Sequence, residues 1–165
     1  MALRRYVASF GASLACLAAA IIFAMIQLSS IPAALLGLLG LAIAGVIALH
    51  YLFFYPLSAC MYIHGDLYVL EVRTPIASVA VSCDRVAIGD ATLATTPLLG
   101  VKLGRKVLGL FTYAGGGRIL CFGAYAVGIV GRATDEPYVI YLSCRGLESL
   151  VNCLKSGDCR YACTA

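Results

Sequence analysis

The sequence predicts a transmembrane hairpin of two helices, followed by a small antiparallel β-barrel that a C-terminal α-helix closes. Three observations support this fold class. No Asp, Glu, Lys or Arg occurs between Tyr6 and Met61. After Met61, short apolar segments alternate with turn-forming residues, which is typical of an all-β domain. Near the C-terminus the apolar spacing changes to that of a helix.

The first 61 residues hold two long apolar runs, which we place at about residues 6–28 and 32–55. Each run can cross a hydrocarbon core of about 30 Å at about 1.5 Å per residue. Pro32 stands where the second helix begins, in a first turn that tolerates proline. A cleaved signal peptide is the alternative for the first run, but a secretory apolar region is usually only about 7–15 residues long. We therefore expect two retained spans.

The charges that flank these runs predict how the hairpin crosses the membrane. Arg4 and Arg5 precede the first run, the break between the runs has no Lys or Arg, and all other basic residues follow the second run. By the positive-inside rule, the N-terminus and the C-terminal domain then face the cytoplasm. We expect a multi-pass protein of the cell membrane.

Both runs carry small residues, which let helices pack closely in lipid. Those of the second run include Gly37, Gly40 and Gly45. These faces either pack on each other within the hairpin or contact other subunits. The second run ends in the aromatic segment His50–Pro56, which we expect at the cytoplasmic membrane interface, with His50 as a polar anchor.

Residues 62–155 are expected to form one domain of about seven strands and one helix. The helix, at about residues 146–155, follows from apolar residues at Leu147, Leu150, Val151 and Leu154. Alternating apolar residues bounded by turn signals predict the strands. These are Tyr68–Arg73, Ile76–Val81, Val86–Ala94, Leu108–Tyr113, Arg118–Phe122, Tyr125–Val130 and Tyr138–Ser143.

Two segments of this domain allow more than one interpretation. Thr95–Arg105 contains a proline and two glycines, and we expect a loop or a kinked edge there. Leu108–Val130 is apolar enough to be a third membrane helix. A charge at Arg118 and three consecutive glycines would be costly in such a helix and favour a β-hairpin.

A family resemblance appears in the same region. It is carried by Pro97–Gly100, Leu108–Tyr113, Gly117-Arg118, Tyr125, and Tyr138–Ser143 with the Leu147–Leu154 helix. Together these segments resemble the prokaryotic pleckstrin-homology-like (PH-like) domains. The resemblance covers about residues 62–155 and implies a seven-stranded, strongly bent barrel capped by the helix. It implies no catalytic residues, and the family pattern does not extend to the Cys-containing tail at 156–165.

Catalytic and metal-binding constellations are not evident in the sequence. After Met61 the only histidine is His64, and the chain has neither a G-x-S-x-G motif nor a P-loop. Acidic residues such as Asp90 fall in predicted turns, where they commonly form local hydrogen bonds. We therefore expect a protein that is not an enzyme and that has no cofactor and no metal.

The eight cysteines divide into groups. Cys16 and Cys60 are expected in or at the edge of the membrane, as small apolar residues. Cys144, Cys153, Cys159 and Cys163 are candidates for disulfides that fasten the tail to the helix; zinc ligation and reduced thiols are the alternatives, and only the last two have zinc-knuckle spacing. A single Asn and a single Gln suggest a thermophilic archaeon or bacterium, where intracellular disulfides occur.

The basic group Lys102, Arg105 and Lys106 lies in a glycine-containing loop. Near an anionic leaflet each such residue gains about 1 kcal/mol, and the alternative is a solvated surface. The net charge of +4 is too small to indicate nucleic-acid binding. The expected partners are membrane lipids and a second copy or another membrane protein.

These features favour a non-enzymatic integral membrane protein whose cytoplasmic domain serves protein–protein or oligomeric assembly. The alternatives are a sensor of anionic lipid surfaces and an accessory subunit of a membrane transporter complex.

Overall fold

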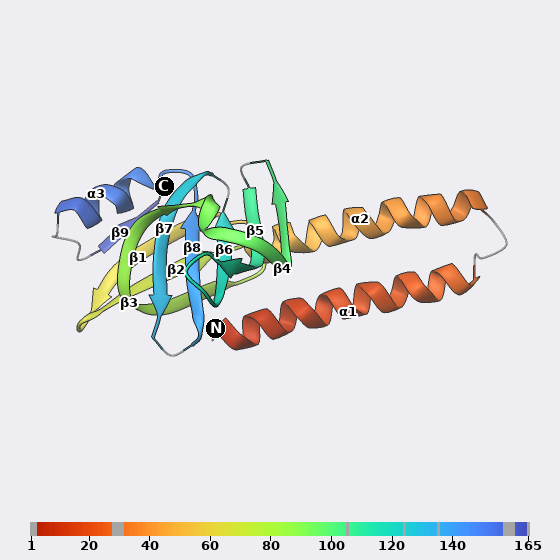
Figure 1. Cartoon of the computed structure of the whole chain (residues 1–165), viewed down its shortest axis with the longest axis horizontal. Helices are drawn as coiled ribbons and strands as arrows, with labels where there is room; N and C mark the ends of the chain where they lie inside the picture. The colour runs from red at the N-terminus through yellow and green to blue at the C-terminus, as the bar shows by residue number, and fades with distance from the viewer. Residues whose placement is uncertain are drawn as a thin grey trace.

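The computed structural model describes residues 3–27, 32–104, 106–123, 125–134, 136–156 and 161–164. Two long helices, α1 (Leu3–Gln27) and α2 (Pro32–Phe54), lie side by side and project from a β-domain as a rod (Figure 1). Both are long and apolar enough to cross a membrane. Large apolar side chains such as Phe23 and Leu36 are exposed along the projecting part, so this part of the rod is not a buried core helix.

Within the described residues, the β-domain contains nine strands, a short 3₁₀ helix, η1 (Ala91–Leu93), and a C-terminal helix, α3 (Glu148–Ser156). The strands are β1 (Ser58–His64), β2 (Leu67–Arg73), β3 (Ser78–Asp90), β4 (Ala94–Leu103), β5 (Lys106–Tyr113), β6 (Arg118–Gly123), β7 (Val127–Ala133), β8 (Tyr138–Ser143) and β9 (Tyr161–Cys163).

All nine strands form one sheet in the order β4-β5-β6-β8-β7-β3-β2-β1-β9. Every neighbouring pair is antiparallel except β6 and β8, which are parallel. Because β4 and β9 are the two ends of this order, the sheet is open. The expected closed barrel is therefore wrong, although the mainly antiparallel sheet after two apolar helices is as predicted.

The domain ends of the two helices are part of the main core. Tyr6 and Phe10 of α1 and Phe53 and Phe54 of α2 are buried against the inner face of the sheet, where they meet Phe122 of β6. Apolar side chains from most strands and from α3 complete this cluster. The helical rod and the sheet are therefore continuous, with one shared hydrophobic core.

A smaller cluster lies on the opposite face of the sheet. Ala94, Val107, Phe111, Ile119 and Tyr141 are buried there, and η1 packs against them through Ala91 and Leu93. Apolar side chains therefore cover both faces of β5 and β6, which explains why residues 107–111 and 119–123 are all buried. This two-sided burial also explains the long apolar segment that resembled a membrane helix.

Leu108–Val130 is not a third membrane helix in this structure. It contains most of β5, all of β6 and the first part of β7, and the three consecutive glycines form the turn between β5 and β6. Gly116 and Gly117 have φ angles of +89° and +93°, values that L side chains rarely adopt.

Several strand predictions differ from the structure. Ile76–Val81 and Val86–Ala94 are not separate strands, because β3 runs through both with a register shift between Cys83 and Arg85 that bends it. Thr95–Arg105 was expected as a loop or kinked edge, and most of it is the edge strand β4, with irregular pairing on both sides of Pro97. The prediction missed β1 and β9.

The C-terminal segment covers one end of the sheet rather than closing a barrel. Helix α3 buries Leu150 in the main core, with Leu147 just before the helix. Strand β9, from the segment assigned to the tail, then pairs with β1. The apolar spacing that predicted the helix was informative, whereas three residues of strand pairing are too few to leave a pattern.

Candidate functional site

The structure places the polar and basic side chains of interest in three regions, which we call the junction, the edge hairpin and the arginine cavity. The junction is the buried contact between the helices and the sheet. The edge hairpin is β4, at the edge of the sheet, with β5. The arginine cavity lies between the β5–β6 and β7–β8 turns. Within the described ranges, no three His, Cys, Asp or Glu side chains gather as a metal site would require.

At the junction, Tyr6 links both helices to the sheet. Its hydroxyl donates a hydrogen bond to the backbone carbonyl of Phe53 and lies 3.2 Å from Oγ1 of Thr74 in the β2–β3 turn. The Thr74 hydroxyl donates in turn to the Ala77 carbonyl at 3.0 Å. Phe53 is near the end of α2, where backbone carbonyls lack helical partners. The Tyr6 hydroxyl thus satisfies one of these carbonyls inside the core.

His50 lies in the same region and is only 3% exposed. Its ring packs edge-on against Phe10, with centroids 4.9 Å apart, and its Nδ1 is 2.7 Å from the Val46 carbonyl, to which it donates. Nε2 has no hydrogen-bond partner in the described chain. The expectation of an interfacial anchor is therefore wrong for His50, because the end of α2 is inside the domain.

The residues of the predicted basic group do not form one cluster among the described residues. Lys106 donates a hydrogen bond to the hydroxyl of Tyr51 and lies over the stacked rings of Tyr51 and Tyr55, 4.9 and 5.6 Å from their centroids. This hydrogen bond is the main cause that raises the pKa of Lys106 above its usual value. Lys102 is exposed on β4, and Arg105 lies outside the described residues.

The edge hairpin packs against the domain end of α2. Val101 of β4 lines an apolar groove of about 350 Å³ together with Ala42, Ile43, Val46 and Ile47 of α2. Leu99 and Leu103 lie on the same face of β4 as Val101, since side chains alternate along a strand, and both are partly exposed. An exposed apolar row on the sheet therefore continues the apolar surface of the rod.

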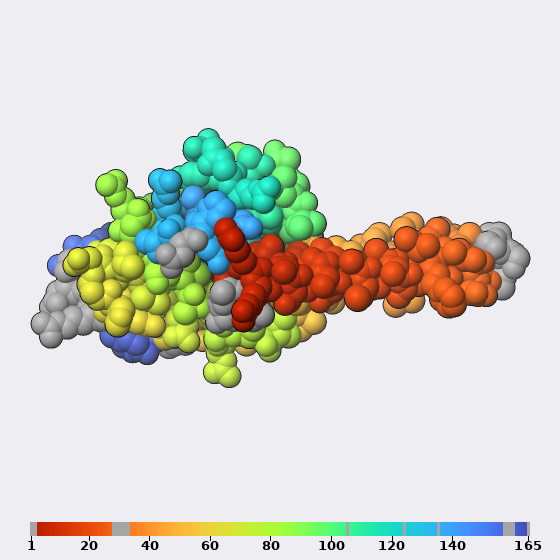
Figure 2. All heavy atoms as spheres, turned by 90° about the horizontal axis from the view of Figure 1, so that it is seen from below, coloured from red at the N-terminus to blue at the C-terminus, as the bar shows by residue number. Residues whose placement is uncertain are grey.

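The arginine cavity has a volume of about 910 Å³ and was not foreseen from the sequence. Arg85 of β3, Arg118 of β6 and Arg132 of β7 line it, with the carboxylates of Asp84 and Glu136. Figure 2 shows the β7–β8 region (blue) against the start of α1 (red) on the face seen from below. These arginines lie far apart in sequence, and only the sheet topology brings them together.

The charges that were expected to orient the hairpin lie beside this region. Arg4 and Arg5 are exposed in the first turn of α1. The backbone N–H of Arg4 donates to Oε1 of Glu136 at 3.1 Å, which ties the β7–β8 turn to the N-terminus of α1. A carboxylate at a helix N-terminus also interacts favourably with the helix dipole.

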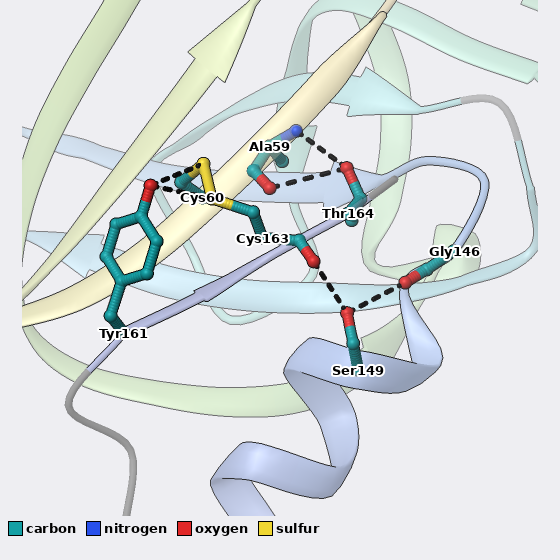
Figure 3. The surroundings of a disulfide bond; sticks show 7 residues. All are labelled: Ala59, Cys60, Gly146, Ser149, Tyr161, Cys163 and Thr164. Carbon is teal, nitrogen blue, oxygen red and sulfur yellow. Dashed lines mark hydrogen bonds between the residues drawn. A yellow bond between two sulfur atoms is a disulfide. The ribbon is translucent and has the colours of Figure 1, made fainter.

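A disulfide joins Cys60 of β1 to Cys163 of β9, so Cys60 is not at the membrane edge as expected (Figure 3). Thr164 reinforces this link, because Ala59 N–H donates to its Oγ1 at 2.9 Å and Thr164 N–H donates to the Ala59 carbonyl at 2.8 Å. The Ser149 hydroxyl of α3 donates to the Cys163 carbonyl at 2.9 Å. The tail is thereby fastened to both β1 and α3.

The other predicted disulfide residues differ in position. Cys144 is a free, buried thiol, contrary to expectation, and Cys153 is disulfide-bonded. Cys159 lies outside the described residues. Burial raises the pKa of the free Cys83 thiol to about 12 and also raises the pKa values of Cys121 and Cys144. These thiols are therefore protonated near neutral pH and unsuited to nucleophilic chemistry.

No protein-family model, curated protein or solved structure matches this chain.

Proposed function

We propose that this chain is a non-enzymatic integral membrane protein whose two-helix anchor holds a PH-like domain against the cytoplasmic leaflet, with the edge hairpin in contact with lipid. The observation that carries this proposal is the continuity between the rod and β4. Val101 packs toward the projecting part of α2, and Leu99 and Leu103 extend that apolar surface onto the sheet.

The exposed apolar side chains of the rod support membrane insertion. Only 6% of an apolar 18-residue window in each candidate span is buried, and the exposed side chains include Ile22, Phe23, Leu36 and Leu41. Such a long exposed apolar surface is unfavourable in water and favourable in a bilayer. A cleaved leader fits poorly, because removal of α1 would take Tyr6 and Phe10 out of the core.

The cytoplasmic orientation rests on charge. Arg4 and Arg5 lie at the domain end of the rod, and the positive-inside rule places that end in the cytoplasm. A disulfide at Cys60–Cys163 is unusual there except in hyperthermophiles. Fusion of a fluorescent protein to the C-terminus in a bacterial host should give fluorescence, whereas an active alkaline phosphatase fusion would show the opposite orientation.

Lipid contact at β4 can be tested with an introduced tryptophan, since the chain has none of its own. In nanodiscs that contain brominated lipid, the fluorescence of a Leu99→Trp variant should be strongly quenched. Ile63→Trp is the matched control, because Ile63 is equally exposed near the β1–β2 turn, at the end of the domain away from the rod (Figure 1). Equal quenching of both variants, or of neither, would contradict the proposal.

The role of charge can be tested in the same variant. Lys102 lies between Val101 and Leu103 on the edge strand and is exposed, on the other face of β4 because side chains alternate. An anionic leaflet would still attract this charge and hold the edge of the sheet against the membrane. Adding Lys102→Glu to Leu99→Trp should therefore reduce quenching in nanodiscs with anionic lipid and leave it unchanged in purely zwitterionic ones. A surface that senses anionic lipid requires this difference.

Protein assembly is the second candidate function, and two features of the rod and sheet favour it. A Cβ on Gly45 would lie 3.1 Å from the Leu17 side chain, so Gly45 packs within the hairpin, whereas a Cβ on Gly37 or Gly40 would meet nothing within 4 Å. Strand β4 is also a sheet edge, which can accept a partner strand. Gly40→Leu should disrupt an oligomer observed by native mass spectrometry, whereas a chain that is already monomeric would exclude self-assembly.

A further inference from the structure

The arginine cavity contains an arrangement that the fold alone does not explain. Arg85 of β3 and Arg132 of β7 are direct register partners in an antiparallel pair, and both line the cavity. Like charges directly opposite each other on neighbouring strands are destabilising. Neither guanidinium, nor that of Arg118, makes a hydrogen bond or ion pair within the described chain. Three guanidinium groups without a hydrogen-bond or ion-pair partner in the described chain therefore line the same cavity.

The walls of the cavity suit a bound molecule. Ala87 and Val130, the register pair two residues along from the arginines, supply an apolar floor. The turn at Gly115–Gly117 forms another wall, where the absence of side chains lets a ligand approach the backbone. The volume of about 910 Å³ is within the range of small-molecule sites and far exceeds that of a single inorganic ion.

Glu136 indicates a second group that the ligand should carry, a hydrogen-bond donor. Its Oε1 accepts the hydrogen bond from the backbone of Arg4, whereas Oε2 is buried and has no partner in the described chain. A buried acceptor without a donor costs free energy. Because Glu136 lines the cavity, rotation of its carboxyl group would bring Oε2 to a ligand hydroxyl while the anionic group of the ligand lies between the arginines.

We propose that the arginine cavity binds a phosphate ester that also carries a free hydroxyl group, with Arg85, Arg118 and Arg132 on the phosphate and Glu136 on the hydroxyl. Guanidinium groups are planar forks that match phosphate oxygens bidentately, and several of them suit a multiply charged group. The ligand is a soluble phosphorylated polyol or the head group of a phospholipid. This proposal does not depend on the function proposed above.

The test uses the full chain in phosphatidylcholine nanodiscs and calorimetric titration with sn-glycerol 3-phosphate. Binding is expected to weaken at least about tenfold in Arg85→Gln and in Arg132→Gln, as expected for a lost charge-assisted hydrogen bond. Arg73→Gln is the matched control, since Arg73 is an exposed strand arginine outside the cavity. Glycerol, which lacks the phosphate, should not bind, and inorganic phosphate, which lacks the polyol, should bind more weakly.

A second arm distinguishes the two sources of the ligand. In nanodiscs that contain phosphatidylglycerol, a head group that occupies the cavity should suppress binding of sn-glycerol 3-phosphate, and native mass spectrometry should find this lipid retained by the wild type but not by Arg132→Gln. Unchanged titration in these nanodiscs would instead assign a soluble ligand. Absence of both bindings, or binding equal in wild type, Arg85→Gln and Arg132→Gln, would overturn the proposal.

Melting temperatures measured without ligand show whether the variants fold. Because Arg132→Gln removes one member of a like-charge pair, its melting temperature in phosphate-free buffer should equal or exceed that of the wild type. Glycerol 3-phosphate should then raise the melting temperature of the wild type but not of the variant. A variant less stable than the wild type without ligand would show that the arginines serve the fold instead, and would also overturn the proposal.

Discussion

The Tyr6 hydroxyl of α1 donates a hydrogen bond to the Phe53 backbone carbonyl of α2, and their rings lie 5.5 Å apart inside the β-domain. The two helices therefore meet each other within the core of the sheet as well as along the rod. Removing the helices would expose residues such as Leu108 and Phe122, which are fully buried beside them. The two-helix rod and the β-domain are therefore one structural unit.

Replacing Tyr6 by Phe tests this link with little change in packing. The variant keeps the ring but leaves the buried carbonyl of Phe53 without its donor, which should lower the free energy of unfolding by about 1–3 kcal/mol. Thermal unfolding in detergent measures the change. Phe23→Leu, at an exposed position on the rod, is the control and should have little effect. A Tyr6→Phe protein as stable as the control would show that the hydroxyl does not contribute.

Loss of the disulfide between Cys60 and Cys163 should destabilise the domain. The bond joins residues 103 positions apart, and a cross-link over so long a loop restricts the unfolded chain strongly. The Cys60→Ala/Cys163→Ala double variant should lose about 2–5 kcal/mol in denaturant unfolding. Cys16→Ala, which removes an exposed free thiol, should not. Equal unfolding midpoints for the two proteins would contradict the prediction.

Gly109 should tolerate no side chain. It has a φ of +108°, and a Cβ there would lie 2.4 Å from the Leu99 carbonyl oxygen and 2.8 Å from the Gly100 Cα. Because these neighbours are backbone atoms of β4, relief requires the edge strand to move. Gly109→Ala should cost about 2 kcal/mol or more and loosen β4, as measured by amide hydrogen exchange of β4. Gly11→Ala, on an open helix face, should be neutral or stabilising.

The free energy of unfolding should fall at alkaline pH, because the folded protein buries a thiol and a phenol that resist deprotonation. Burial raises the pKa of Cys83 from 9.0 to about 12 and that of Tyr141 from 10.0 to about 12. The unfolded chain therefore loses these protons first, so the stabilisation is complete below about pH 9 and is lost as the pH rises toward 12. Melting temperatures from pH 8 to 11 should decline, and less steeply in Cys83→Ala. Parallel declines in both proteins would exclude a contribution from Cys83.

Much of the secondary structure followed from local patterns. The glycine turn before Arg118 and the apolar spacing of the C-terminal helix are signals that need no knowledge of distant contacts. The predictions were wrong where contacts between distant segments of the chain determine the structure. Cys60 looked like part of the membrane edge because it follows an apolar run, but its place is set by pairing with β9, about a hundred residues later. The openness of the sheet likewise depends on which strands find partners.

The functional regions show the same difference between local sequence patterns and contacts between distant segments. Lys102 and Lys106 are close in sequence and could be noticed together, yet one is exposed and the other is held by Tyr51. The arginine cavity had no such local signal. Arg85 and Arg132 are 47 residues apart in numbering and become neighbours only because β3 pairs with β7.

The sequence by itself determined that two long apolar helices precede a β-rich domain, because hydrophobic length and strand alternation are local properties of the chain. Only the tertiary structure decided that the sheet stays open, that the helix ends enter its core and that three arginines share a cavity. These features depend on pairing and packing between segments far apart in the chain, whose free energies no local pattern encodes.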